Sequence, residues 1–369
     1  MAAFGVTVNI MKITFFIGSL SGGGAERQAC QLMNYLRKRK HDVSVIIMQD
    51  NGQSYDLDTD IPVYPLCKKD DIQNWFFRKL VRLYRLQEKV RRLDTDCYVV
   101  FLPVTALLLL SLKWLKKTKY VYSERVWPGY YNHSFFKILK MFVGKADGVV
   151  YQTVETQQFY EPLDVKLKAV IPNAINDGLI KHRMKPLKKE KVIVSAGRLV
   201  PEKNFALLID AFSLVSDEFE DYRLCIFGSG SDLGNLQERV RKIGLESRVD
   251  FIEYTLNFTQ RLERAALFVL PSTVEGIPNV LMEAMALGVP CVALDCDGGG
   301  AKLLLGNNEN GILVSKNDSE EMAQAIGTVL SNREYATSMA SNANRFIRTF
   351  SEDEIYRRWE TFLFRVCSG

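Results

Sequence analysis

The stretch EGIPNVLMEAMAL, residues 275–287, decides how this sequence folds. It follows the apolar run Leu267–Leu270, which has the length and composition of a buried parallel strand. It opens a helix whose first turn carries Pro278, where the missing N–H of proline is no loss. The predicted order is therefore strand, loop and helix, one unit of a parallel α/β sheet.

Two carboxylates lie eight positions apart in this stretch, Glu275 in the loop and Glu283 one turn into the helix. The backbone N–H groups near the helix start belong to Asn279, Val280 and Leu281. Free donors there, with the positive end of the helix dipole, suit a phosphate, whereas the carboxylates suit neutral hydroxyls. A nucleotide sugar combines both groups. The alternative is an ordinary amphipathic helix with both glutamates in solvent.

Strands and helices alternate along the whole chain. Strands are expected at 12–18, 43–48, 98–102, 119–123 and 148–152, and again at 192–195, 222–227, 249–252, 267–270, 291–294 and 311–314. Two such βαβ series predict an α/β fold of two doubly wound, Rossmann-like domains facing across a cleft, which suits 369 residues. The expected domains are 1–180 and 190–345, joined by a Lys-rich linker at 181–191, with a last helix in 346–369 crossing back to the first domain.

The composition excludes several kinds of protein. Seven scattered cysteines without a Cys-x-x-Cys pair argue for a reducing compartment and against a zinc site or a disulfide framework. The three histidines are dispersed, so no metal is expected, and His41 is expected in a turn. No secretory signal precedes Met11, which is an alternative start, and the longest apolar run, 97–112, is too short to span a bilayer.

Positive charge is concentrated in the first half of the chain. Residues 1–180 carry a formal charge of +8 and the remainder −3. No nucleic-acid-binding motif accompanies this charge, so nucleic acid is not an expected partner. An anionic membrane surface is the better candidate.

The expected helix at 71–93 interleaves aromatic residues with arginines and lysines. This pattern fits a segment that lies in a membrane interface or grips an anionic lipid headgroup. The residues assigned to that contact are Arg78, Lys79, Arg82 and Arg85. A domain helix with a solvated basic face is the alternative, although two further basic and apolar segments in the first half favour the membrane.

Glycines and cations follow the first strand of each series. Gly23 and Gly24 lead into a helix, where they let a substrate approach the backbone or serve only as a turn. Arg198 and Lys203 follow the first strand of the second series. There a guanidinium and an ammonium would stabilise the charge of a departing diphosphate without a metal, unless they are plain surface charges.

Three other strand ends carry candidate contacts. Gly228 and Gly230 either approach a nucleotide or make a tight turn. Tyr254 offers an aromatic face to a base, with a structural role equally open. Glu124 and Arg125 end the strand at 119–123, where residues that face the ligand lie in such sheets.

Together these motifs resemble the family-four retaining glycosyltransferases of the GT-B fold. The resemblance spans 11–358 and rests on SGGGAE at 21–26, Gly197-Arg198 with Lys203, Ile171-Pro172-Asn173, and above all Glu275 with Glu283. It implies a UDP-linked nucleotide sugar, held mostly by the second domain, and no divalent metal. The implied contacts are Arg198 and Lys203 on the diphosphate, Glu283 on the ribose, Glu275 on the transferred sugar, and the backbone of Gly23 and Gly24 approaching from the first domain.

Two segments, 123–128 and 147–153, look like a branch that adds hexoses or N-acetylhexosamines to lipid-linked or surface glycans. A lipid-linked glycan acceptor on the first domain and peripheral binding to the cytoplasmic face of the inner membrane are therefore implied. This chain departs from the family at Arg125, where many members have a His that touches the transferred sugar. It departs again at Lys302, where members often have an acidic residue.

The expected reaction transfers the sugar with retention, for capsule, O-antigen or glycoprotein glycan synthesis. A departing phosphate oxygen would take the proton of the acceptor hydroxyl, so no carboxylate pair of the glycosidase kind is needed. The residues assigned to catalysis are Arg198, Lys203 and Glu275. The alternatives are a nucleotide-sugar epimerase or phosphorylase on the same fold and a non-catalytic, membrane-bound glycan-assembly scaffold.

Overall fold

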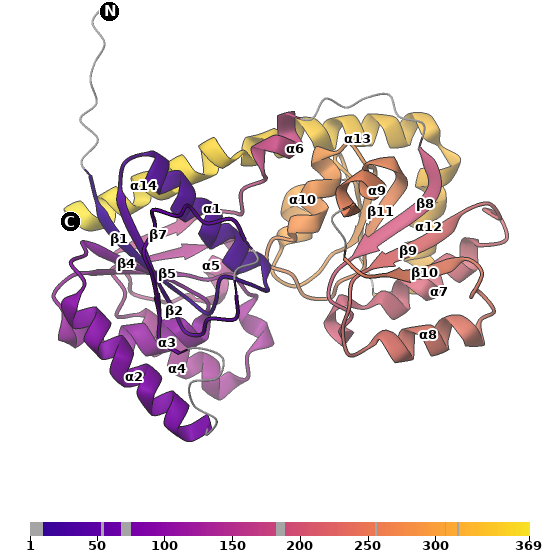
Figure 1. Ribbon diagram of the computed structural model, residues 1–369. Helices are drawn as coiled ribbons and strands as arrows, with labels where there is room; N and C mark the ends of the chain where they lie inside the picture. Colours follow the sequence, from indigo (N-terminus) through magenta and orange to yellow (C-terminus); the bar gives the residue numbers. More distant parts are fainter. Residues whose placement is uncertain are drawn as a thin grey trace, which may run out of the picture. The chain divides into compact units, whose positions relative to one another are not determined.

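The chain forms two compact units, each built on its own sheet (Figure 1). The computed structural model describes residues 10–52, 55–67, 75–181, 189–254, 257–306, 308–315 and 317–369. Unit 1 comprises Met1–Ile171 and Ile355–Gly369, and unit 2 comprises Pro172–Glu354. The chain therefore enters unit 2 after Ile171 and leaves it after Glu354, and nearly all of the last helix, α14 (Glu352–Ser368), belongs to unit 1.

Unit 1 is built on a parallel sheet in the order β3-β2-β1-β4-β5-β6-β7. Its strands are β1 (Lys12–Ile17), β2 (Asp42–Ile47), β3 (Val63–Pro65), β4 (Cys97–Phe101), β5 (Lys119–Ser123), β6 (Gly148–Tyr151) and β7 (Leu167–Val170). The five predicted strands of this half are confirmed within one residue at either end. β3 and β7 were missed because three or four residues are too short for a periodic pattern.

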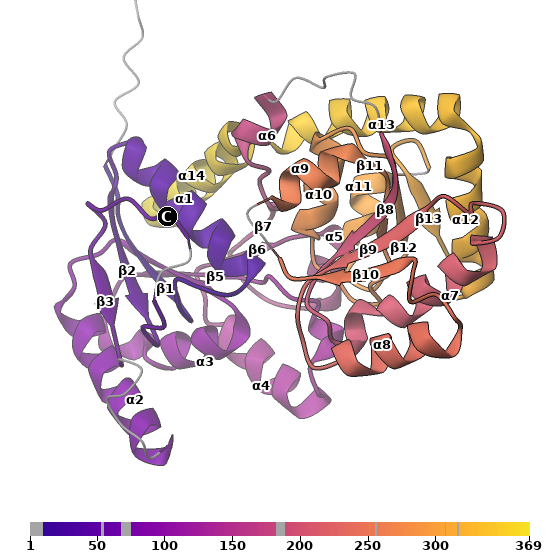
Figure 2. The ribbon, with the colours of Figure 1, turned by 45° about the vertical axis from the view of Figure 1, so that its right-hand side comes forward.

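Helices cover both faces of this sheet (Figures 1 and 2). One face carries α1 (Gly24–Lys38) and α14, and the other carries α2 (Trp75–Arg92), α3 (Pro103–Ser111) and α4 (His133–Val143), with α5 (Val154–Phe159) after β6. Side chains along β4 alternate between the two layers. Tyr98 and Val100 belong to the core that α2, α3 and α4 share, whereas Phe101 stacks on Trp359 of α14 at 5.9 Å. Period-two alternation thus places one residue set against each helix layer.

His41 fastens α14 to the sheet. The Met11 N–H donates to His41 Nδ1 at 3.1 Å, and His41 Nε2 lies 2.9 Å from Glu360 Oε1. The ring is 1% exposed. His41 lies in the short connection between α1 and β2, as expected, but both of its ring nitrogens have partners inside unit 1, which the sequence does not predict.

Unit 2 repeats the architecture with a parallel sheet in the order β10-β9-β8-β11-β12-β13. Its strands are β8 (Glu190–Ala196), β9 (Arg223–Phe227), β10 (Val249–Ile252), β11 (Ala265–Leu270), β12 (Cys291–Leu294) and β13 (Ile312–Val314). Its helices are α6 (Asp177–Lys181), α7 (Phe205–Val215), α8 (Leu233–Lys242), α9 (Phe258–Arg264), α10 (Asn279–Ala286), α11 (Gly300–Leu305), α12 (Ser319–Ser331) and α13 (Arg333–Ile347). All six strands predicted for this half are confirmed, and most of the predicted linker lies outside the described residues.

Each sheet reverses its strand order once, between β1 and β4 in unit 1 and between β8 and β11 in unit 2. This is the doubly wound arrangement that the sequence predicts. In such sheets, ligands bind outside the carboxyl ends of the strands on either side of the reversal. The loops after β1, β4, β8 and β11 are therefore the places to look for a site.

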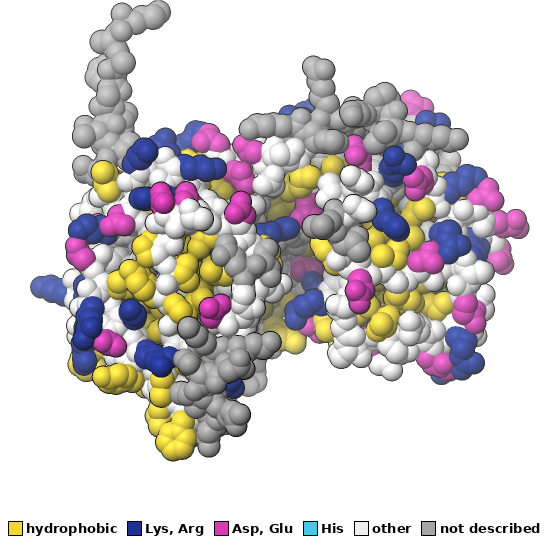
Figure 3. Space-filling view, in the orientation of Figure 1, with side chains coloured by type: hydrophobic (Ala, Val, Ile, Leu, Met, Phe, Trp, Pro, Cys, Tyr) yellow, Lys and Arg dark blue, Asp and Glu magenta, His cyan; other side chains and the backbone are white. Residues whose placement is uncertain are grey.

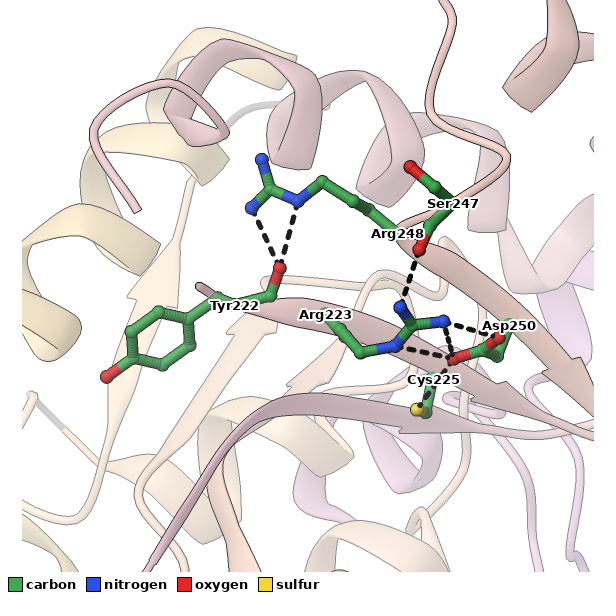
Figure 4. Close-up of polar contacts among 6 residues, drawn as sticks. All are labelled: Tyr222, Arg223, Cys225, Ser247, Arg248 and Asp250. Carbon is green, nitrogen blue, oxygen red and sulfur yellow. Dashed lines mark hydrogen bonds and ion pairs between the residues drawn. The ribbon is translucent and has the colours of Figure 1, made fainter. Parts of the chain in front are cut away.

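Two arginines fasten the amino ends of β9 and β10 in unit 2 (Figure 4). Arg223 on β9 forms an ion pair with Asp250 on β10 at 2.8 Å and donates to the carbonyl oxygen of Ser247 at 2.5 Å. Arg248 donates to three carbonyl oxygens at 2.6–3.1 Å, those of Ser216, Phe219 and Tyr222. These contacts hold the amino ends of β9 and β10 in place. The candidate site lies at the opposite, carboxyl ends of the strands.

Candidate functional site

The strand reversal of unit 2 brings Lys203 and Glu275 together. Lys203 ends the short turn η3 (Pro201–Lys203) after β8, and Glu275 lies in the loop after β11. Lys203 Nζ and Glu275 Oε1 form an ion pair, and the two side chains are only 18% and 13% exposed. Two residues assigned to one ligand from the sequence are therefore in direct contact, at the edge where such sheets bind ligands.

The loop that carries Glu275 is fixed by backbone hydrogen bonds on both sides. The Thr273 N–H donates to the carbonyl oxygen of Glu202 in η3 at 3.0 Å. The Glu275 N–H donates to the carbonyl oxygen of Asp297 at 3.1 Å, and the Asp297 N–H donates to that of Thr273 at 3.2 Å. The carboxylate of Glu275 is thus presented by a pre-organised loop.

The glycines after β9 are explained by the packing of two loops. A Cβ atom on Gly228 would lie 1.8 Å from the carbonyl oxygen of Gly197, and one on Gly230 would lie 2.2 Å from that of Leu199. Both distances are impossible for a side chain, so the two loops can approach only with glycine at these positions. Gly228 and Gly230 therefore support the loop that contains Arg198.

Three other residues singled out in the sequence lie in solvent. The side chain of Arg198 is 76% exposed, and its NH2 group lies 3.9 Å from Glu202 Oε1. Tyr254 is 57% exposed, and its ring lies 4.6 Å from that of Phe258. Lys302 is exposed on α11. Among the described residues, the structure records an ion pair of Glu275 with Lys203 and none with Arg198.

The start of α10 differs from the expectation in two respects. Pro278 is the residue before the helix and does not lie in its first turn. Its carbonyl oxygen accepts the N–H of Leu281 at 3.2 Å, so this N–H is not a free donor for a phosphate. Asn279 and Val280 form the first two positions of the helix, and Glu283, one turn later, is only 8% exposed.

In the glycine-rich turn of unit 1, the carboxylate of Glu26 lies against Gly23. Gly23 is the cap residue of α1 and Gly24 its first residue, and a Cβ atom on Gly23 would lie 2.5 Å from Glu26 Oε2. Burial raises the pKa of Glu26, and hydrogen bonds from the backbone of Glu26 and Gly23 lower it by less. Tyr55 donates its hydroxyl to the carbonyl oxygen of Gly23 at 2.9 Å. Glu26 belongs to SGGGAE, but no role was predicted for it, although its spacing from Gly23 is that of a capping box.

Arg125 is packed inside unit 1. Its guanidinium lies 5.0 Å from the ring centre of Phe101 and 5.4 Å from that of Trp359. Its Nε donates to Ser123 Oγ at 2.7 Å. Burial lowers the pKa of Arg125 to about 10. The side chain of Arg125 therefore links Ser123 at the end of β5 to Trp359 of α14.

Glu124, the neighbour of Arg125, is fully buried and collects several hydrogen bonds. Three tyrosine hydroxyls and two backbone N–H groups donate to its carboxylate at 2.5–3.3 Å, those of Tyr122, Tyr131, Tyr160, Arg125 and Val126. Burial nevertheless raises the pKa of Glu124. This cluster fixes the chain just beyond the carboxyl end of β5. Glu124 was predicted at this strand end, among residues that face the ligand, but its burial and its tyrosine partners were not predicted.

The four basic residues assigned to a lipid headgroup do not share one environment. Arg82 donates to Gln49 Oε1 and Arg85 to the carbonyl oxygen of Leu66, both at 2.7 Å, so these two face the sheet of unit 1. Arg78 is half-buried and Lys79 is exposed. Among the residues of α2 whose exposure the structure describes, Phe77, Leu80 and Tyr84 are apolar and exposed.

Comparison with known proteins finds glycosyltransferases over nearly the whole chain. The family model "Glycosyltransferase Family 4" matches residues 22–179, and the model "Glycosyl transferases group 1" matches residues 180–346. An uncharacterized glycosyltransferase of Haemophilus influenzae is 27% identical over 359 residues, covering 95% of this chain and 99% of the relative.

Two further matches carry more specific names. A Campylobacter jejuni protein named as the alpha-1,4-N-acetyl-D-galactosaminyltransferase for GalNAc-alpha-(1->4)-GalNAc-alpha-(1->3)-diNAcBac-PP-undecaprenol is 26% identical, covering 95% of this chain and 97% of the relative. The crystal structure of Anabaena Alr3699/HepE in complex with UDP-glucose has a TM-score of 0.81 at 20% identity, covering 96% of this chain and 100% of that one. This structural likeness confirms the fold of two doubly wound α/β domains.

Proposed function

Because the chain belongs to the glycosyltransferases of the GT-B fold, we propose that it moves a hexose or N-acetylhexosamine from a UDP-sugar to a lipid-linked glycan. Unit 2 binds the donor and unit 1 the acceptor. The UDP-glucose complex of the Anabaena protein supports the donor, and the name of the Campylobacter relative supports an undecaprenol-linked acceptor. The product belongs to capsule, O-antigen or glycoprotein glycan synthesis at the cytoplasmic face of a bacterial inner membrane.

The ion pair of Lys203 with Glu275 is the observation that carries this proposal. An ammonium group has three N–H donors, so Lys203 can keep its contact with Glu275 and still donate to a diphosphate oxygen. Glu275 has acceptor positions left for the hydroxyls of the transferred sugar. The pair therefore supports a donor whose diphosphate and sugar lie side by side, with the exposed Arg198 as a second cation.

The reaction proceeds with retention of the anomeric configuration. The bond between the anomeric carbon and the diphosphate oxygen breaks while the acceptor hydroxyl attacks from the same face. The departing oxygen takes the hydroxyl proton, so no side chain serves as a general base. Lys203 and Arg198 stabilise the negative charge that develops on the diphosphate.

Thermal unfolding with nucleotides tests the donor. A ligand that binds only the folded state raises the unfolding midpoint in a concentration-dependent way. We expect UDP and one UDP-sugar to raise it at concentrations where ADP and GDP do not. The effective UDP-sugar is then incubated with an undecaprenyl-diphosphate-linked glycan, and NMR of the product gives the anomeric configuration. A shift with ADP or GDP alone, or an inverted product, would contradict the proposal.

Unit 1 presents apolar and basic side chains on the same helices. Exposed apolar residues include Phe77, Leu80 and Tyr84 on α2, Trp114 just after α3, and Ile138 and Met141 on α4. In Figure 3, apolar and basic side chains lie together over α2. No helix in the described part of the chain is both long enough and apolar enough to cross a bilayer. An apolar strip beside basic residues supports binding to the surface of an anionic membrane.

Charge reversal on α2 tests this contact. Each basic residue near an anionic surface contributes about 1 kcal/mol, so R78E/K79E should weaken vesicle binding at least about thirtyfold. Arg82 and Arg85 are left unchanged because they bond inside unit 1. Co-sedimentation with vesicles containing phosphatidylglycerol measures the effect.

The control for this experiment is R91E/R92E, at the other end of the same helix. It changes the net charge by the same amount but leaves the apolar strip and its basic neighbours intact. Equal loss of binding in both variants would show a general charge effect and no defined surface. Wild-type binding by R78E/K79E would place the membrane contact elsewhere.

A further inference from the structure

Asn173 lies where the chain enters unit 2, and its side chain is only 4% exposed. Its Nδ2 donates to the carbonyl oxygen of Ile277 at 3.1 Å and to Oδ1 of Asn279 at 3.0 Å. These two acceptors flank Pro278, the residue before α10. One buried amide therefore holds the chain on both sides of the helix start.

The start of α10 depends on this contact because the helix has no side-chain cap of its own. Ordinary cap residues are Ser, Thr, Asp or Asn, whose side chains accept an N–H from the first turn. Pro278 offers only its carbonyl oxygen, which accepts the N–H groups of Leu281 and Met282 at 3.2 Å each. A displacement of Pro278 would therefore displace the whole first turn.

Asn173 is itself held by a fixed segment. The Ile175 N–H donates to the carbonyl oxygen of Phe350 at 2.8 Å. The Glu352 N–H donates to Asp177 Oδ1 at 3.1 Å. Phe350 and Glu352 lie just before the chain leaves unit 2. Two hydrogen bonds therefore join the entering and leaving segments next to Asn173 in the sequence.

We propose that Asn173 is a positioning residue for the donor. It ties the start of α10 to the paired segments at which the chain enters and leaves unit 2. It thereby sets where the first backbone N–H groups of α10 and the buried carboxylate of Glu283 meet the nucleotide. This inference rests on the proposed function, because it concerns the same donor, but the placement of the helix start can be measured without any ligand.

The same helix offers a matched control at its other end. Asn344 is 7% exposed, and its Nδ2 donates to the carbonyl oxygen of Ala286, the last residue of α10, at 2.6 Å. N173A and N344A thus remove the same side chain, with similar burial, from opposite ends of one helix. A general loss of stability should appear in both variants, whereas a positioning role should appear only in N173A.

Hydrogen–deuterium exchange of the ligand-free protein provides the first measurement. We expect N173A to speed exchange at least about fivefold in a peptide covering 277–283, because the first turn loses both hydrogen bonds from the Asn173 amide. N344A should leave that peptide at the wild-type rate. Wild-type exchange in N173A, or the same change in both variants, would overturn the inference.

Titration with UDP provides the second measurement. We expect N173A to bind UDP about tenfold more weakly than wild type and N344A to bind it equally well, since a small displacement of a binding group is costly. Faster exchange in N173A with unchanged UDP affinity would also overturn the inference. If wild type does not bind UDP, the proposed donor is wrong, and the exchange comparison still decides whether Asn173 places the helix start.

Discussion

Replacing Lys203 with alanine is expected to reduce the turnover number about a hundred- to a thousandfold, the usual effect of losing a group that stabilises developing charge. Lys203 is the largely buried cation at the strand reversal of unit 2. Its removal takes a positive charge from the leaving diphosphate and leaves Glu275 without its partner. The turnover number and KM are measured with the UDP-sugar found by thermal shift.

Two companion variants separate charge from geometry at this pair. K203R keeps the charge, but the planar guanidinium directs its N–H donors differently from an ammonium, so partial activity is expected. E275Q leaves Lys203 in place and removes the negative charge beside it. If E275Q lowers turnover as strongly as K203A, the carboxylate contributes more than hydrogen bonding to the sugar.

The control for K203A lies on β8, the strand that precedes the turn with Lys203. Lys191 near the amino end of β8 forms an ion pair with Asp221 at 2.5 Å, but these side chains are 58% and 74% exposed. Exposed pairs contribute little, so K191A should retain wild-type turnover and stability. Wild-type turnover in K203A would remove Lys203 from the mechanism.

The sequence predicts the sheets well because long strands leave a strong local signal. Buried parallel strands appear as continuous apolar runs, as in β11 before EGIPNVLMEAMAL. The rule that ligands bind at the carboxyl ends of strands then assigns Lys203 and Glu275 to one ligand, although they lie 72 positions apart. The rule does not predict the ion pair between Lys203 and Glu275, because it locates the ends of strands but not the side chains.

Other parts of the candidate site depend on contacts that leave no local pattern. The partner of His41 is Glu360, 319 residues away, and the pairing exists only because α14 returns to unit 1. The N–H of Leu281 is lost to the carbonyl oxygen of Pro278, a local detail of how this helix begins. Asn173 stands 104 residues before the carbonyl group that it binds. Strand and helix periodicity carries no information about such contacts.

Replacing Glu124 is expected to give the second large effect, a loss of stability. Its carboxylate is fully buried and accepts hydrogen bonds from three tyrosine hydroxyls and two backbone N–H groups. Replacement by alanine leaves these donors without their acceptor in a buried space. Unsatisfied buried groups cost about 1–3 kcal/mol each before relaxation, so E124A should lower the free energy of unfolding by about 3–5 kcal/mol.

The size of this effect should depend on whether an acceptor remains. Burial raises the pKa of Glu124, and the hydrogen bonds from Tyr160, Tyr122 and the backbone lower it by less. E124Q keeps one acceptor oxygen and the shape of the side chain, so it should cost clearly less than E124A. Urea unfolding followed by tyrosine and tryptophan fluorescence compares the two variants with wild type.

Glu88 on α2 supplies the matched control within unit 1. It pairs with Arg92 one turn away at 3.0 Å, and the two side chains are 37% and 77% exposed. E88A should therefore change the free energy of unfolding by less than about 0.5 kcal/mol. Equal losses in E124A and E88A would mean that the tyrosine cluster does not stabilise unit 1. Equal losses in E124A and E124Q would mean that the negative charge, and not the supply of acceptors, holds the three hydroxyls together.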